Sequence, residues 1–182
     1  MSPRSTKRFH MVQFFKHLIL LISALAATVF FSSSASSLEK PSTPVLLEIS
    51  GNITQSNSDG SKALIDRSLL TSLPRTKIDT MTPWTDGRTV FEGVLVRDLL
   101  DLVGADGKTV QAIAINDYMV EIPMEDFVKY DVIVADHKNG DTMSIRDKGP
   151  LWIIYPWNTN PELVNEVYHS RSIWQLRKLV IK

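Results

Sequence analysis

A segment rich in reactive side chains lies at residues 80–88, with the sequence TMTPWTDGR. It gathers hydroxyls, an indole, a carboxylate and a guanidinium between two predicted elements, and loops held by a rigid scaffold are where binding groups concentrate. The same residues also suit a Thr-Asp-Gly turn in which the tryptophan covers the edge of the core. The candidate ligand-binding residues of this loop are Thr80, Thr82, Trp84, Thr85, Asp86 and Arg88.

Two further groups of residues could contact a ligand. Asn116, Asp117 and Tyr118 offer polar groups and a phenol, although such residues also form ordinary hairpin turns. Arg146 and Lys148 lie close to a glycine whose backbone N–H could approach a phosphate or carboxylate. A solvated turn before a buried strand explains this second group equally well.

Metal and nucleophile chemistry have little support in the residue types. His137 and His169 stand far apart, without partners at metal-ligand spacing, so we expect both at the surface and no metal site. The sequence contains no cysteine, which excludes disulfides, thiolate metal sites and a thiol nucleophile. No nucleophile-elbow glycine pattern supports a Ser-His-Asp triad.

The charge distribution argues against nucleic acid as a partner. The 182 residues hold 20 basic and 20 acidic side chains, but residues 1–35 contain four basic and no acidic ones, which leaves 16 against 20 in the remainder. A mildly acidic domain without a basic stripe is poorly suited to a phosphate backbone. With 43% hydrophobic residues, we expect one ordinary packed domain.

Residues 1–37 predict an export signal. A basic, polar start is followed by the apolar run LILLISALAATVFF at 18–31 and by small residues at 32–37. Because a membrane-spanning helix needs about 20 apolar residues, this run is short, and we expect cleavage after Ala35 or Ser37. The domain at 38–182 is then periplasmic in a two-membrane bacterium, and it contacts the membrane only if the signal stays uncleaved.

Hydrophobic periodicity predicts many short strands and few helices. We expect helices at 66–73, capped by Asp66, at 94–103, ended by Gly104, and at 123–129. Because these elements show neither βαβ alternation nor a repeat, we expect an α+β fold with a mixed or antiparallel sheet. The expected strands are at 45–50, 76–82, 109–115, 118–122, 132–135, 142–145, 151–155 and 174–181.

Four sequence blocks follow one another in a familiar order. They are FEGVLVRDLLDLVGA at 91–105, NDYMVEIPMED at 116–126, GPLWIIYP at 149–156 and RSIWQLRKLVI at 171–181. Their order and spacing resemble the molybdopterin-binding domain of the sulfite oxidase family, and in particular its small exported bacterial members. The resemblance covers about residues 45–182, and it implies a sheet-rich α+β fold with a cofactor pocket among its loops.

The chain departs from the catalytic members of this family at the molybdenum ligand. In catalytic members a cysteine thiolate binds molybdenum in a loop that corresponds here to residues 82–87, where no cysteine stands. We therefore expect an exported module that binds a small organic anion or a membrane signalling protein, with Arg171, Arg88, Arg146 and Lys148 available for an anion. The alternative is a periplasmic molybdopterin-dependent oxidoreductase in which Asp86 or a threonine hydroxyl replaces the thiolate.

Overall fold

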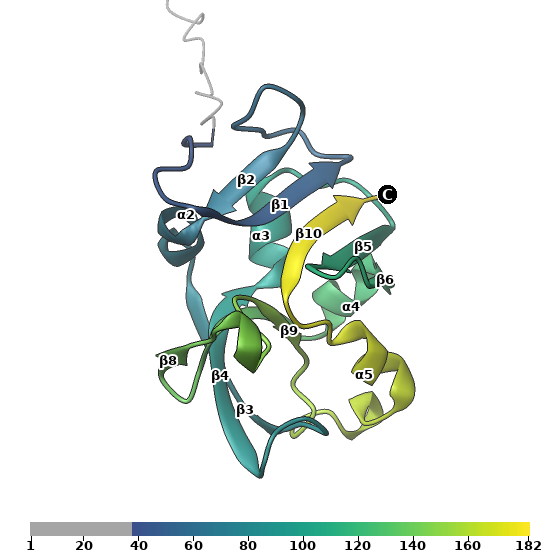
Figure 1. Ribbon diagram of the computed structural model, residues 1–182. Helices are drawn as coiled ribbons and strands as arrows, with labels where there is room; N and C mark the ends of the chain where they lie inside the picture. Colours follow the sequence, from purple (N-terminus) through teal and green to yellow (C-terminus); the bar gives the residue numbers. More distant parts are fainter. Residues whose placement is uncertain (1–37) are drawn as a thin grey trace, which may run out of the picture. The chain divides into compact units, whose positions relative to one another are not determined.

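Short strands build two sheets in the computed structural model, which describes residues 38–182 (Figure 1). The predicted export signal at 1–37 lies outside the described residues. The first sheet contains, in spatial order, β2 (Ala63–Asp66), β1 (Val45–Gly51), β10 (Leu176–Ile181), β5 (Thr109–Ala114) and β6 (Met119–Pro123). The second contains β3 (Arg75–Met81), β4 (Arg88–Leu95), β7 (Ile133–Lys138) and β8 (Asp141–Thr142), with β9 (Trp152–Ile154) also paired to β7.

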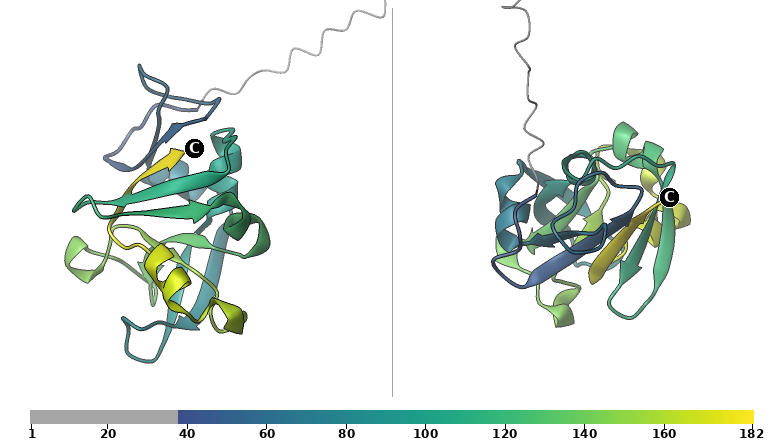
Figure 2. Two further views of the ribbon diagram at one scale, coloured as in Figure 1. Left: turned by 90° about the vertical axis from the view of Figure 1, so that its right-hand side faces the viewer. Right: turned by 90° about the horizontal axis from the view of Figure 1, so that it is seen from above.

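The strand pairings confirm the predicted mixed, α+β architecture. All of them are antiparallel except that of β1 with β10, which is parallel. Figure 2 shows the C-terminal strand β10 running between the first strand and the β5–β6 hairpin, so the two ends of the described chain meet in one sheet.

The helices are short and connect or flank the strands. Within residues 38–182, no helix is both long and apolar enough to cross a membrane. The helices are α2 (Arg67–Ser72), α3 (Val96–Leu102), α4 (Met124–Lys129) and α5 (Glu166–Arg171), with 3₁₀ turns at Ile145–Asp147 and Pro161–Leu163.

Strand β4 corrects one sequence-based prediction. The predicted helix at 94–103 begins only at Val96, because Val94 and Leu95 pair with β7 in the second sheet. The strand passes so close to β7 that a Cβ at Gly93 would lie 2.0 Å from the carbonyl oxygen of Val134. Sheet pairing therefore overrides a helical periodicity that extends into the strand. The predicted left-handed helix end is confirmed, since Gly104 has φ +58°.

Asp66 ties the N-terminal segment to the first sheet and caps α2. One carboxylate oxygen accepts the backbone N–H of Leu69 at 2.9 Å, as expected for an N-cap. The other accepts the backbone N–H groups of Ser42, at 2.8 Å, and Thr43, at 3.0 Å. The hydrogen bond from Leu69 and those from Ser42 and Thr43 hold the pKa of Asp66 well below its usual value of 3.8.

A second buried carboxylate, that of Asp126 on α4, joins α5 to the end of β9. It accepts hydrogen bonds from the hydroxyl of Tyr155 at 2.7 Å and from the guanidinium of Arg171 at 2.8 Å. Burial, together with the adjacent negative charge, raises the pKa of Tyr155 far above its usual range, so this phenol remains a donor. Arg171, a predicted ligand contact, is thus committed to holding α5 in place.

We predict that Asp66→Ala lowers the free energy of unfolding by about 2 kcal/mol at pH 7, the upper range for loss of an N-cap. Because the folded-state pKa is depressed, this stabilisation is complete above the unfolded pKa and is lost as the pH falls below about 4. Urea unfolding between pH 7 and pH 3 measures both effects. Asp66→Asn keeps an acceptor for the backbone N–H of Leu69 and should lose less unfolding free energy than Asp66→Ala. If the difference in unfolding free energy between wild type and Asp66→Ala did not change with pH, the depressed pKa of Asp66 would be contradicted.

We also predict that Arg171→Met destabilises the fold more than Asp126→Asn does. Removing the guanidinium leaves a buried carboxylate without its counter-charge, which costs about 3 kcal/mol or more. Asp126→Asn keeps an acceptor for Tyr155, and Arg171 can turn its charge to solvent. Urea unfolding at pH 7 compares the two variants. Equal losses of unfolding free energy would show that the unpaired carboxylate of Asp126 is not the cause of the destabilisation.

Candidate functional site

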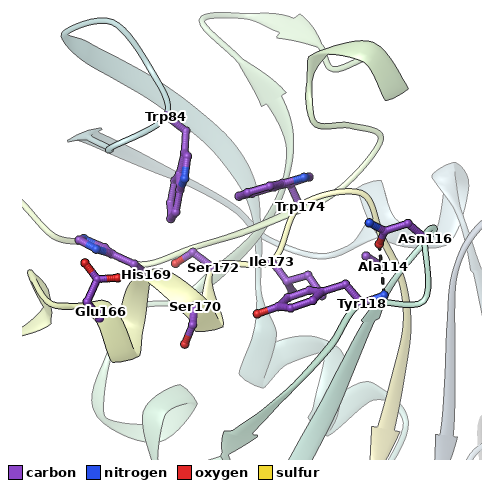
Figure 3. A pocket seen from close by; sticks show the side chains of 10 residues that line it. All are labelled: Trp84, Ala114, Asn116, Tyr118, Glu166, His169, Ser170, Ser172, Ile173 and Trp174. Atoms are coloured by element: carbon purple, nitrogen blue, oxygen red, sulfur yellow. Dashed lines mark hydrogen bonds between the residues drawn. The ribbon is translucent and has the colours of Figure 1, made fainter.

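A pocket of about 360 Å³ opens beside α5 and the turn between β5 and β6 (Figure 3). Its size falls within the range of small-molecule sites. We call it the aromatic pocket. The residues that line it are Trp84, Ala114, Asn116, Tyr118, Glu166, His169, Ser170, Ser172, Ile173 and Trp174.

Four of the ten lining residues carry aromatic rings. The Trp84 and Trp174 rings lie 5.4 Å apart between centroids, with an angle of 66° between their planes. The His169 ring lies 5.8 Å from Trp84, at 77°. Tyr118 and Trp174 are 52% and 37% exposed, so large apolar surfaces face the solvent here.

Hydroxyl groups of the 80–88 loop hold Trp84 in position. Thr82 accepts a hydrogen bond from the backbone N–H of Trp84 at 3.1 Å, and its hydroxyl lies 2.9 Å from that of Thr85. The hydroxyl of Thr80 is fully buried and accepts the backbone N–H of Asn158 at 3.2 Å. The loop therefore matches both predictions made from its sequence. It forms a turn that packs Trp84, and Trp84 also lines the pocket.

The predicted hairpin turn places Asn116 and Tyr118 on the opposite side. Asp117 adopts a left-handed conformation, with φ +63°, and its carboxylate accepts a hydrogen bond from Arg177 at 2.8 Å. The side-chain oxygen of Asn116 accepts the backbone N–H of Tyr118 at 3.2 Å, as Figure 3 shows. Asn116 and Tyr118 thus reach the pocket, whereas Asp117 is engaged outside it.

Helix α5 supplies a wall that the sequence prediction missed. It contributes Glu166, His169 and Ser170, and His169 is half-buried rather than at the surface as predicted. Asn165 caps the helix by accepting the backbone N–H of Val167 at 2.9 Å. An asparagine followed at once by a glutamate is a recognised helix-start signal, and it could have located this helix.

The predicted cations do not line the aromatic pocket. Arg88 pairs with Asp79 at 2.9 Å, and Arg146 is exposed on the 3₁₀ turn at Ile145–Asp147. Lys148 is not among the lining residues either, but its ammonium lies 5.9 Å from the centroid of the Trp174 ring. Asp86 is also outside the lining and is exposed on its loop. The cluster of positive charge expected from the sequence is thus not assembled at this pocket.

His137, the other histidine expected at the surface, belongs to a structural cluster instead. Its ring lies 3.0 Å from the fully buried carboxylate of Asp136, which also pairs with Arg67 and Arg75. Burial alone would raise the pKa of Asp136, but the hydrogen bonds from Arg75 and His137 outweigh it and lower the pKa. These side chains connect α2 and β3 to β7, away from the pocket lining.

The donor set of the aromatic pocket does not fit molybdopterin held by the usual thiolate. The chain has no cysteine, and among residues 38–182 no three histidine, aspartate or glutamate side chains come together as a metal site. The lining also lacks an arginine or lysine that could pair with the phosphate of the pterin. The side chains present are suited instead to apolar contact and a few hydrogen bonds.

Comparison with solved structures finds a chain of similar fold. The chain matches the crystal structure of the sulfane dehydrogenase SoxCD from Paracoccus pantotrophus with a TM-score of 0.56 and 19% sequence identity. The match covers 80% of this chain and 40% of the SoxCD chain, so the present chain spans less than half the length of that neighbour. No curated protein matches the sequence.

The family model described as the oxidoreductase molybdopterin binding domain matches residues 69–164, more than half of the chain. This match includes the 80–88 loop, the β5–β6 hairpin and β9, and it confirms the resemblance carried by the sequence blocks. The chain therefore belongs to the oxidoreductase molybdopterin binding domain family.

Proposed function

We propose that this chain is an exported binding module, which uses the molybdopterin-binding fold to take a small organic ligand into the aromatic pocket. The observation that carries the proposal is the group of partly exposed aromatic rings, Trp84, Tyr118 and Trp174, around a cavity of ligand size. Exposed apolar surface gathered around a concave site, with a few polar groups, is typical of small-molecule binding.

The polar groups of the pocket can bind a ligand and fix its orientation. Asn116 uses its side-chain oxygen on its own turn, which leaves its amide N–H₂ available to a ligand. Glu166 and His169 stand on α5 with carboxylate and imidazole groups at the pocket. Such groups can fix the position of a ligand whose apolar part lies against the tryptophans.

The residue types favour binding over molybdenum catalysis. A cysteine-held molybdenum is excluded by composition, and Asp86 is exposed on its loop, outside the lining of the aromatic pocket. The rival function is an oxidoreductase in which Asp86 or a threonine hydroxyl replaces the thiolate. Thr80 and Thr82, however, already hold the backbone of their own loop or of its neighbour.

Export and a signalling partner complete the proposal. The signal predicted at 1–37 would deliver the domain to the periplasm, where a membrane signalling protein could read the state of the pocket. Exposed apolar side chains that neighbour lining residues in the sequence, at Ile115, Met119 and Val167, offer contact surface for such a partner.

Elemental analysis tests the choice between binding module and molybdenum enzyme. We expect protein exported with its own signal, from cells that make the cofactor, to contain far less than one molybdenum atom per chain. Mass spectrometry of the same sample, after denaturation, checks for a released pterin. Stoichiometric molybdenum would overturn the proposal, and loss of that metal in Asp86→Asn would establish the rival function.

A binding screen tests the pocket itself. Small metabolites are added to the protein, and binding is followed by tryptophan fluorescence and calorimetry. We expect Trp174→Ala to weaken a bound metabolite by about tenfold or more, as removal of a central aromatic contact does. Trp174→Phe should retain part of the affinity, and Val128→Ala, an exposed apolar change on α4, should retain all of it. Unchanged affinity in Trp174→Ala would place the ligand elsewhere.

A further inference from the structure

We propose that the ligand of the aromatic pocket is a compact organic cation, a methylated or quaternary ammonium group enclosed by the rings with Glu166 as its counter-charge. This inference rests on the proposed function, because it names the chemical class of the ligand for the same site. It replaces the organic anion expected from the sequence, for which the pocket lining offers no cation.

The arrangement of the rings is the first argument. A flat ligand needs parallel faces above and below it, whereas Trp84 meets Trp174 at 66° and His169 at 77°. Rings at such angles form the corner of an enclosure rather than a slot, and Figure 3 shows Tyr118 on a further side. Aromatic enclosures of this kind attract ammonium groups, because the faces of the rings carry partial negative charge.

The charge of the lining is the second argument. Glu166 is the one residue among the ten lining residues that is an Asp, Glu, Lys or Arg. It takes part in none of the ion pairs found within residues 38–182. Arg88 and Arg171 are engaged with Asp79 and Asp126 instead. The pocket therefore presents one carboxylate and several aromatic faces, which together favour a positive ligand.

Lys148 provides a means of testing the sign of the ligand's charge. Its ammonium lies over two indoles of the same cluster, 5.8 Å from the centroid of Trp152 and 5.9 Å from that of Trp174. The protein thus already places a cation against these rings. A second cation in the pocket would be repelled by Lys148 and attracted by Glu166, so the two residues should affect its affinity in opposite directions.

The test compares choline with 3,3-dimethylbutan-1-ol, a neutral molecule of the same shape in which carbon replaces the charged nitrogen. Both are titrated into the exported protein by calorimetry, with tryptophan fluorescence as a second readout. We expect choline to bind about tenfold more tightly or better, the contribution of cation–π contacts at a partly desolvated site. Equal affinities for the two compounds would overturn the inference, because shape alone would then explain binding.

Charge variants then locate the effect. Glu166→Gln should weaken choline binding about threefold, and Lys148→Met should strengthen it by a similar factor, as expected for single exposed charges. Glu162→Gln removes an exposed carboxylate from the neighbouring 3₁₀ turn, outside the lining, and is the matched control that should leave affinity unchanged. The reverse result, tighter choline binding in Glu166→Gln and weaker binding in Lys148→Met, would contradict the cation assignment and overturn the inference.

The outcomes also separate this inference from the proposed function. If choline does not bind but a screened metabolite does, and Trp174→Ala abolishes that binding, the cation assignment fails while the binding module stands. If no small molecule binds and molybdenum is stoichiometric, both proposals fail. Choline binding that is unchanged in Trp174→Ala would place the cation outside the aromatic pocket and would overturn the inference alone.

Discussion

The burial of Trp152 is the packing constraint on which the site depends. Its ring is fully buried on β9, 5.2 Å from Phe91 of β4, and its indole N–H donates to the carbonyl oxygen of Ser172 at 3.0 Å. The same ring lies 6.0 Å from Trp84 and 6.2 Å from Trp174. One side chain thus connects the core of the second sheet to both tryptophans of the pocket. A pocket built on a fixed ring needs little ordering when a ligand arrives.

The ionic groups of the domain are divided between structure and site. The buried carboxylates of Asp126 and Asp136 each engage an arginine, because an unpaired charge in the interior is strongly unfavourable. Arg171 anchors α5 in this way, which explains why a residue expected to hold a ligand holds the fold instead. Glu166, at the solvent-exposed start of the same helix, has no such structural task among the described residues.

Local signals predicted most of the elements, because they act over a few residues. Asp66 caps α2, and the turn at Asn116–Asp117 closes a hairpin, as their residue types indicate. Strand β4 and helix α5 escaped prediction for different reasons. The apolar residues at the end of β4 fit a helical face equally well, and only pairing with β7 decides between the two. Helix α5 is short and carries no buried face of its own.

By itself, the sequence determined the family, the mixed sheet architecture and the absence of a thiolate, since each depends on residue identity and order. It also singled out Trp84, Asn116 and Tyr118, which do face one pocket. Only the tertiary structure decided that His169 and Trp174 join them and that the candidate cations do not. The ring centroids of Trp84 and His169 lie 5.8 Å apart because both residues pack on a shared core. No local sequence pattern encodes which distant segments become neighbours in that core.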